Sequence, residues 1–279
     1  MPGVRPASPG RRLAPLVLTV AVGAACGAPT RVTLPDGPGT PLADPTTLLG
    51  AATVACRAVD AITAEAAMSG RVGGRRVRGR LLFGVDRLGR LRLEAVAPFG
   101  APLLVLAASE RGTTLVLPRD GRVLEGAALA DVLDALVGLR LGGVDLHAVL
   151  TGCPPGGARA AGGRRYPRRL SAIDLDAGGT VWVREEPTGA RLVVREAGGL
   201  TVEYADFALG VATRLTIVAA GQGGLAASEL VLRLSQVERG VPLDDRAFEV
   251  EVPAGSTPLT LDELRQSGPL SGSGRPSGS

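Results

Sequence analysis

Ten or eleven short runs of residues, several of them alternating between apolar and polar side chains, constrain the fold of this 279-residue chain more than any other feature. In Leu91-Arg92-Leu93-Glu94 the period is two, as in a β-strand with one wet face. Glycine, aspartate and proline separate the runs, as at Asp120-Gly121, so we expect antiparallel neighbours. The runs cover residues 77–86, 90–97, 103–109, 113–118, 122–125, 170–175, 180–185, 191–196, 200–207, 213–218 and 229–237.

Three other segments have helical periodicity. Asp44 and Pro45 form an N-cap followed by proline at the first helical position. After them, apolar residues recur at spacings of three and four at Leu48, Ala52, Ala55, Val59, Ile62 and Ala66. Residues 129–137 and 144–150 predict two shorter helices. One helix at the start and two in the middle exclude a βαβ fold, so we expect a mainly β (α+β) protein with a single curved antiparallel sheet.

The amino terminus has the pattern of an export signal. Arg5, Arg11 and Arg12 precede thirteen almost wholly apolar residues, 13–25, which are too few for the roughly 20 residues of a membrane span. The small residues that end this run stand directly before Cys26, an arrangement that resembles a bacterial lipobox. We therefore expect cleavage before Cys26 and its acylation. The alternative is an ordinary secretory peptide whose cleavage site happens to precede a cysteine.

Composition divides the remainder of the chain. Residues 26–44 are rich in proline, glycine and threonine and predict a flexible tether. Residues 45–265 carry the periodic segments and predict the folded domain, after a signal peptide at residues 1–25. Residues 266–279 are almost entirely serine, glycine and proline and predict a disordered tail.

Composition also excludes several classes of site. All 31 basic residues are arginine, so neither a P-loop nor a lysine Schiff base is possible. A single histidine and three scattered cysteines exclude a multi-histidine or Cys-X-X-Cys metal site, and we expect no metal and no cofactor. His147 has no Gly-X-Ser-X-Gly serine anywhere in the chain, so we expect no enzyme. Without the signal segment, 28 arginines face 27 acidic residues, which removes the best reason to expect a nucleic-acid partner.

A family resemblance rests on the order and spacing of four segments. These are Ala97-Pro98-Phe99-Gly100 after a strand, residues 146–154 with His147 and Pro154, Arg169-Leu170-Ser171-Ala172-Ile173, and Trp182. Over about residues 46–237 the chain resembles the LolB branch of the LolA/LolB lipoprotein-localization superfamily, and residues 238–265 extend past the usual LolB end. The resemblance implies a half-open antiparallel β-barrel of about 10–11 strands, with an N-terminal helix and a helical lid over an apolar cavity.

The resemblance also implies site residues. Pro98, Phe99 and Gly100 match a protruding membrane-contact loop, although Phe99 at a turn could equally pack in a core. Cys56 and Cys153 are left once Cys26 is acylated, and either pair between the first helix and the lid or stay as small buried thiols. An apolar strand face would line the cavity, or would form ordinary core: Leu91, Leu93, Val181, Val183, Leu192, Val194, Val202, Tyr204, Leu215, Ile217, Leu230 and Leu232.

The function that the resemblance implies is that of a lipid-anchored, monomeric lipoprotein on the periplasmic face of the outer membrane. It would accept the acyl chains of lipoproteins from a periplasmic LolA-type carrier and help to insert them into the outer membrane. Two alternatives remain: a carrier of another amphiphile, such as a glycolipid, on the same fold, and a structural or assembly scaffold whose barrel is filled.

Overall fold

The structure is a computed structural model that describes residues 3, 31–97, 102–154, 156–221 and 227–267. The chain divides into residues 1–31 and residues 32–279, and every helix and strand described belongs to the second unit. Fifteen strands, four α-helices and one 3₁₀-helix are formed by the described residues. The expectation of a mainly β protein is therefore confirmed.

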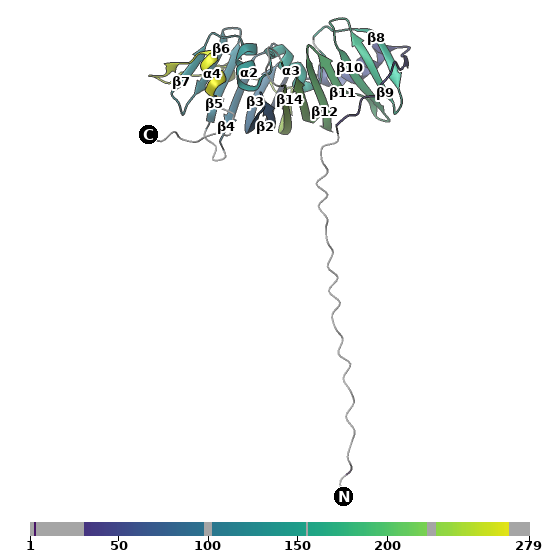
Figure 1. The fold of residues 1–279 in the computed structure, drawn as a ribbon, viewed down its shortest axis with the longest axis horizontal. Helices are drawn as coiled ribbons and strands as arrows, with labels where there is room; N and C mark the ends of the chain where they lie inside the picture. Colours follow the sequence, from purple (N-terminus) through teal and green to yellow (C-terminus); the bar gives the residue numbers. More distant parts are fainter. Residues whose placement is uncertain (1–2, 4–30, 98–101, 155, 222–226, 268–279) are drawn as a thin grey trace. The chain divides into compact units, whose positions relative to one another are not determined.

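All fifteen strands belong to one sheet, in the order β1-β8-β9-β10-β11-β12-β13-β14-β2-β3-β4-β5-β6-β7-β15 (Figure 1). Neighbouring strands are antiparallel except β15, which is parallel to β7. The strands are β1 (Thr40–Pro41), β2 (Ala61–Val72), β3 (Arg75–Asp86), β4 (Leu91–Val96), β5 (Pro102–Ser109), β6 (Gly112–Leu117), β7 (Arg122–Glu125), β8 (Ala160–Tyr166), β9 (Leu170–Leu175), β10 (Thr180–Glu186), β11 (Gly189–Ala197), β12 (Leu200–Ala208), β13 (Val211–Ala219), β14 (Ser228–Arg239) and β15 (Thr257–Pro258).

The half-open barrel of 10–11 strands is corrected in two respects. The sheet ends at β1 on one side and at β15 on the other and does not close. It also has four strands beyond the eleven runs, namely β1, β2, β8 and β15. Of these, β8, with the sequence Ala-Ala-Gly-Gly-Arg-Arg-Tyr, lacks the apolar alternation by which a strand is recognised. The two-residue strands β1 and β15 form the edges of the sheet, where they pair with β8 and β7 respectively. Very short edge strands limit the number of unpaired backbone groups that the sheet exposes.

Helix α1 (Pro45–Arg57) is shorter than its periodicity predicted. The Asp44 carboxylate caps it by accepting a hydrogen bond from the Thr47 N–H at 2.9 Å, as the Asp44-Pro45 pair indicated. The segment that contains Ile62 and Ala66 forms strand β2 instead. Alanine-rich residues 61–68 satisfy both periods, and the strand prevails because its alternate residues are buried against the helices and pair with β3 and β14.

Two antiparallel meanders build the sheet. The first is β2 to β7 and the second is β8 to β14, and the pairing of β14 with β2 joins them in the centre. Since β7 and β8 lie near opposite edges, residues 126–159 must return across one face. This crossing contains α2 (Leu129–Val137) and α3 (Gly143–Thr151). We call the face that the helices cover the inner face and the opposite one the outer face.

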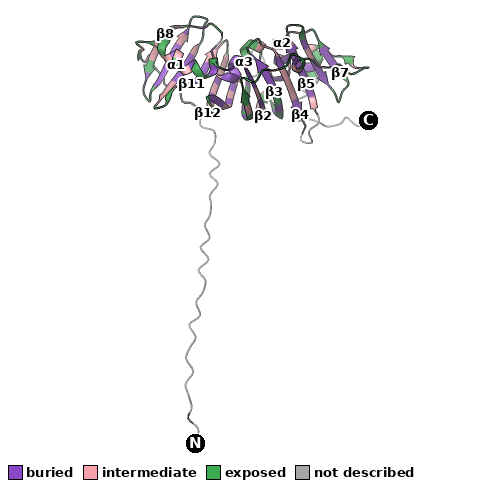
Figure 2. Ribbon diagram, turned by 180° about the vertical axis from the view of Figure 1, so that it is seen from behind, coloured by how far each residue is buried: buried purple, intermediate pink, exposed green. Residues whose placement is uncertain are grey.

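The main core lies between the inner face and the helices. Leu49 of α1, Val132 of α2, Val149 of α3 and Leu264 of α4 (Leu261–Ser267) all belong to it, together with alternate residues of the strands. Figure 2 shows this alternation as buried and more exposed bands along the strands. The four helices therefore share one apolar core with the sheet.

A smaller cluster lies on the outer face of β8 to β11. The rings of Tyr166 and Trp182 have centroids 5.4 Å apart, and Val32 and Leu34 pack against the cluster. Residues 32–41 of the expected tether therefore lie on the sheet, where Thr40 pairs with Arg165. The contacts that hold this segment on the sheet include those of Val32 and Leu34 with the apolar residues of the outer cluster. The cluster consists of Tyr166, Leu170, Ala172, Trp182, Val193 and Val194.

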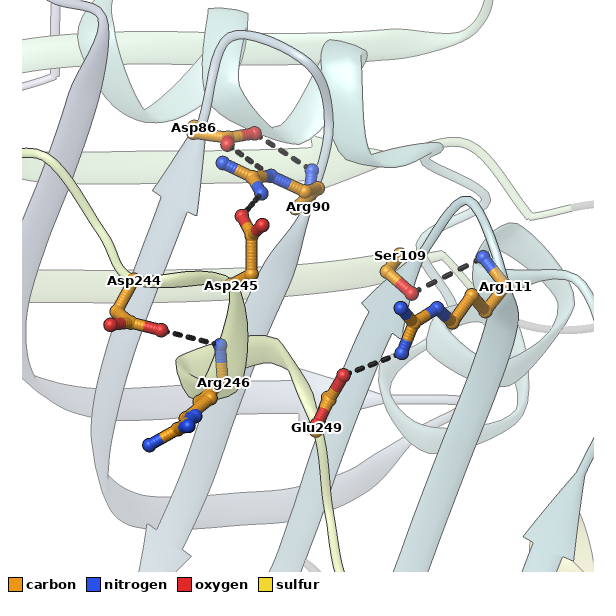
Figure 3. Close-up of polar contacts among 8 residues, drawn as sticks. All are labelled: Asp86, Arg90, Ser109, Arg111, Asp244, Asp245, Arg246 and Glu249. Carbon is orange, nitrogen blue, oxygen red and sulfur yellow. Dashed lines mark hydrogen bonds and ion pairs between the residues drawn. The ribbon is translucent and has the colours of Figure 1, made fainter.

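The C-terminal residues run from the outer face to the inner one. The 3₁₀-helix η1 (Asp245–Phe248) packs against β4 and β5, where Arg90 contacts both Asp86, at 2.6 Å, and Asp245 (Figure 3). Arg111 pairs with Glu249 at 2.5 Å. The chain then pairs with β7 as β15 and ends in α4, which packs on α2. Of residues 238–265, which extend past the usual LolB end, only the part in α4 thus belongs to the helical cover.

A disulfide ties α1 to the end of the helical crossing. Cys56 and Cys153 are bonded, with Cα atoms 5.6 Å apart and a sequence separation of 97. Of the two states considered for these cysteines, the structure has the paired one. The bond therefore joins two parts of the helical cover that lie over different strands. Helix α1 packs on β8, β10 and β11, whereas the disulfide's other cysteine follows α3, which packs on β2, β3 and β13.

Replacing both cysteines by serine (Cys56→Ser with Cys153→Ser) should lower the free energy of unfolding by about 2–4 kcal/mol, because a long loop in the unfolded chain is no longer closed. Urea denaturation followed by circular dichroism measures the change. Wild-type protein in excess reductant should reproduce the double variant. Identical unfolding midpoints with and without the bond would contradict the prediction.

Candidate ligand cavity

A cavity of about 890 Å³ lies at one end of the inner face, beside the helical cover. Its walls come from the β2–β3 and β11–β12 turns, the end of β13 and the start of β14, while α2, the α2–α3 connection and Arg265 of α4 complete it. Cavities that bind small ligands measure about 300–1,000 Å³. The volume is thus sufficient for a ligand with a substantial apolar part.

Glycines at the ends of the elements leave this space open. Gly73, Gly198 and Gly199 lie in the hairpin turns of the wall and have φ values of 54°, 58° and 78°. Residues other than glycine rarely adopt such positive φ values. Gly138 ends α2 in the left-handed conformation at φ 66°. Because none of these residues has a side chain, the turns approach the helices without filling the interval.

The walls are apolar with a positive balance of charge. Val72, Val77, Leu136 and Leu141 are among the aliphatic residues that line the cavity, and Ala135 of α2 adds a small side chain. The charged lining residues are four arginines and two aspartates, namely Arg75, Arg140, Arg195, Arg265, Asp134 and Asp145. This excess of positive charge favours an anionic group in the ligand.

Three of these arginines belong to the rim and one to the buried wall. Arg140 pairs with Asp131 at 2.7 Å and Arg265 contacts Asp134 at 3.6 Å. Arg195 differs because only 5% of its surface is exposed. Its Nε and Nη1 atoms are buried and have no hydrogen-bond partner among the described residues.

The sheet register directs Arg195 to the inner face. Arg195 of β11 pairs with Val181 of β10 and with Val202 of β12. The same row continues through Ile217 and Leu230, and all four aliphatic residues belong to the main core. Arg195 is therefore the one charged side chain among five consecutive positions of this inner row.

A β-bulge produces this orientation. Trp182 pairs with Val194 but Val183 pairs with Leu192, so Val193 is an extra residue on β11. Residues on the two sides of the bulge change face: Leu192 and Arg195 point inward, whereas Val194 joins the outer cluster with Trp182. The expectation that Leu192 and Val194 share one face is therefore corrected.

Tyr204, on the neighbouring strand, has a second unpartnered polar group. It follows Val202, the partner of Arg195, by two residues and faces the same core. Its Oη is buried without a hydrogen-bond partner among the described residues. Burial raises the pKa of Tyr204, and the positive charge of Arg195 acts in the opposite direction. The phenol therefore stays protonated at neutral pH.

The twelve strand residues that were predicted to line a cavity lie elsewhere in the structure. None of the twelve lines this one. Leu93 and Val194 lie at the edge of the main core and in the outer cluster respectively. Side chains of the helices fill the space above the rest, which pack as core: Leu91, Val181, Val183, Leu192, Val202, Tyr204, Leu215, Ile217, Leu230 and Leu232.

Other predicted site residues are Cys26, Pro98, Phe99 and Gly100, which lie outside the described residues. His147, considered and rejected as a catalytic group, is buried in α3, and burial together with the charge of Arg87 lowers its pKa. No group of metal-binding side chains occurs in the part of the chain that the structure describes. None of the helices in that part has the length and apolar character of a membrane span.

Arg195 is the residue that the sequence analysis missed. Simple alternation from Leu192 and Val194 assigns it to the wet face of the strand. The available signal is the run Leu192-Val193-Val194, because three consecutive apolar residues break the period of two and indicate a bulge.

Comparison with known proteins gives distant similarities only. No protein-family model matches the chain, and no curated protein matches it. Among solved structures it is similar to a LolA superfamily protein, NE2245 from Nitrosomonas europaea, at 14% identity over 73% of this chain and 96% of that chain, with a TM-score of 0.49.

Two further solved structures are a DUF1329 family protein from Desulfovibrio piger and the lipoprotein LppX from Mycobacterium tuberculosis. The first is 14% identical over 75% of this chain and 98% of that chain, with a TM-score of 0.46. The second is 12% identical over 72% and 98%, with a TM-score of 0.31. NE2245 is a member of the LolA superfamily, which the sequence resembles. Because the identities are low and the TM-scores are below 0.5, we base the functional proposal on the cavity itself.

Proposed function

We propose that this protein is an exported lipoprotein that binds the acyl part of an amphiphile in the cavity beside α2. The observation that carries the proposal is the cavity of about 890 Å³, whose wall includes the aliphatic residues Val72, Val77, Leu136, Leu141 and Leu200. Moving an acyl chain from water to such a wall is favourable by about 0.8 kcal/mol for each buried methylene. A chain of many methylenes therefore gains enough free energy to be held without a covalent bond.

The finer role we propose is the one that the sequence resemblance implies. The protein is anchored by acylated Cys26 on the periplasmic face of the outer membrane, acts as a monomer without a catalytic step, receives acylated lipoproteins from a LolA-type carrier and helps to insert them into the membrane. The lipobox-like residues before Cys26 and the order of the four family segments support this role.

Arg195 favours a second candidate, a carrier of another amphiphile on the same fold. A charged guanidinium in the cavity wall gives no advantage in binding a bare hydrocarbon, and its burial is costly without a compensating group. An amphiphile with a polar group close to its acyl chain fits such a wall better than an acyl chain alone.

Filling the cavity tests both candidates. Ala135→Trp on α2 should weaken binding of a fluorescent fatty-acyl probe at least tenfold, because Ala135 lines the cavity. Fluorescence titration of the delipidated mature protein measures the dissociation constant. The matched control is Val54→Trp, an exposed position on α1 that does not line the cavity and should bind like wild type. No probe binding by wild type would overturn both carrier functions and leave a scaffold role; equal effects of the two variants would exclude this cavity as the site.

The native amino terminus tests the anchor. Mass spectrometry of protein purified from its own membranes should show a chain that begins at Cys26 and carries a diacylglyceryl group with an N-linked acyl chain. Cys26→Ser should yield a protein released from the membrane fraction. A native terminus that starts elsewhere, or an unmodified Cys26, would refute the lipoprotein assignment.

Phe99 tests the insertion step. Phe99→Glu should leave binding of the acyl probe unchanged and reduce lipoprotein transfer to membranes at least tenfold, because a carboxylate cannot enter lipid as an aromatic ring can. Leu209→Glu is the control, since Leu209 is an apolar residue at a turn and is 76% exposed. Wild-type transfer by Phe99→Glu, or an equal loss in Leu209→Glu, would refute the role of the loop.

A further inference from the structure

We propose that Arg195 is the anchor for an anionic headgroup, so that the amphiphile bound in the cavity carries a carboxylate or a phosphate close to its acyl chain. This inference rests on the proposed function, because it assumes that an amphiphile occupies the cavity, and it goes further in specifying the charge and place of the headgroup. The residue that binds the headgroup and the chemical class of the ligand follow from the same observations.

The first observation is that two guanidinium nitrogens of Arg195 are buried without a partner among the described residues. A guanidinium remains protonated in a protein, so it cannot avoid the cost of burial by losing its proton. Only 5% of the surface of Arg195 is exposed, and the two nitrogens are Nε and Nη1. Buried donors of this kind ordinarily have partners. An anionic ligand would supply the partner that the described part of the chain lacks.

The second observation is that Arg195 borders open space. It is a lining residue of the cavity, next to Ala197, Gly198 and Gly199 of the β11–β12 turn. A ligand in the cavity thus contacts the Arg195 side chain, and a rotation of the guanidinium would turn its buried Nε and Nη1 donors toward that ligand. The fork of N–H groups matches the geometry of carboxylate and phosphate oxygens, and bonds between ionised partners are the strong ones.

The rim arginines are mostly ion-paired. Arg140 pairs with Asp131 at 2.7 Å, and Arg265 pairs with Asp262 at 2.8 Å and contacts Asp134 at 3.6 Å. Selectivity for an anion therefore rests on Arg195, the buried cation of the cavity wall. Neutral lipids lack the group that it would bind.

The test compares three C16 probes on the delipidated mature protein: palmitate, 1-palmitoyl lysophosphatidic acid and neutral 1-monopalmitoylglycerol. Wild type should bind the better of the two anionic probes at least tenfold more tightly than the neutral one, measured by displacement of a fluorescent acyl probe below micellar concentrations. A preference for palmitate identifies a carboxylate and a preference for lysophosphatidic acid identifies a phosphate; either supports the anchor.

Arg195→Met should lower the affinity for the anionic probes at least tenfold and leave the neutral probe within twofold, so that the preference disappears. Arg233→Met is the matched control, because it removes the same charge at an exposed position of β14 and should keep the preference. Arg195→Lys keeps the charge without the planar fork and should retain part of the preference. Circular dichroism verifies the folding of each variant, and Arg195→Lys decides the case should Arg195→Met fail to fold.

The outcomes separate this inference from the function on which it rests. Equal affinity of wild type for neutral and anionic probes would overturn the anchor and leave the acyl-binding function intact. The same holds for a preference that survives in Arg195→Met or is lost equally in Arg233→Met. If wild type binds none of the three probes, the proposed function itself fails.

Discussion

The pairing of β14 with β2 is the constraint on which the rest of the structure depends. These antiparallel strands pair from Glu229 opposite Arg71 to Arg239 opposite Ile62, although they are more than 150 residues apart along the chain, and they join two separate meanders into one sheet. Each meander alone is a series of local hairpins. The central pairing is the long-range contact, and it places β7 and β8 near opposite edges. The intervening residues must then cross the inner face, so the helical cover is a consequence of the strand order.

The cavity follows from the limits of that cover. Helices α1, α2 and α3 fill the middle of the inner face with aliphatic side chains, and the strand residues beneath them form ordinary core. At the hairpin ends, glycines such as Gly73 and Gly198 replace side chains by open space. The sheet therefore has a packed centre and a cavity at one end. A ligand site at the end of the sheet needs no opening of the main core.

Arg195 shows how a local irregularity changes the chemistry of a face. The bulge at Val193 shifts the alternation of β11 by one residue, which moves Val194 outward and Arg195 inward. A buried guanidinium without a partner opposes folding, whereas the aliphatic residues of the same row favour it. Binding residues are often held in positions that are unfavourable in the empty protein, because the ligand provides the missing interaction.

The sequence by itself determined the class of most elements, since alternation, the Asp44 cap and the turn residues are local signals: strands β3 to β7 and β9 to β14, the start of α1 and the helices α2 and α3 appear where these signals are. Only the tertiary structure decided the state of residues 61–68, which fit both helical and strand periods and became a strand through pairing with β3 and β14. It also decided that the sheet stays open, that Cys56 meets Cys153, and that Arg195 faces inward, because a register shift, an edge and a contact across 97 residues depend on partners far along the chain.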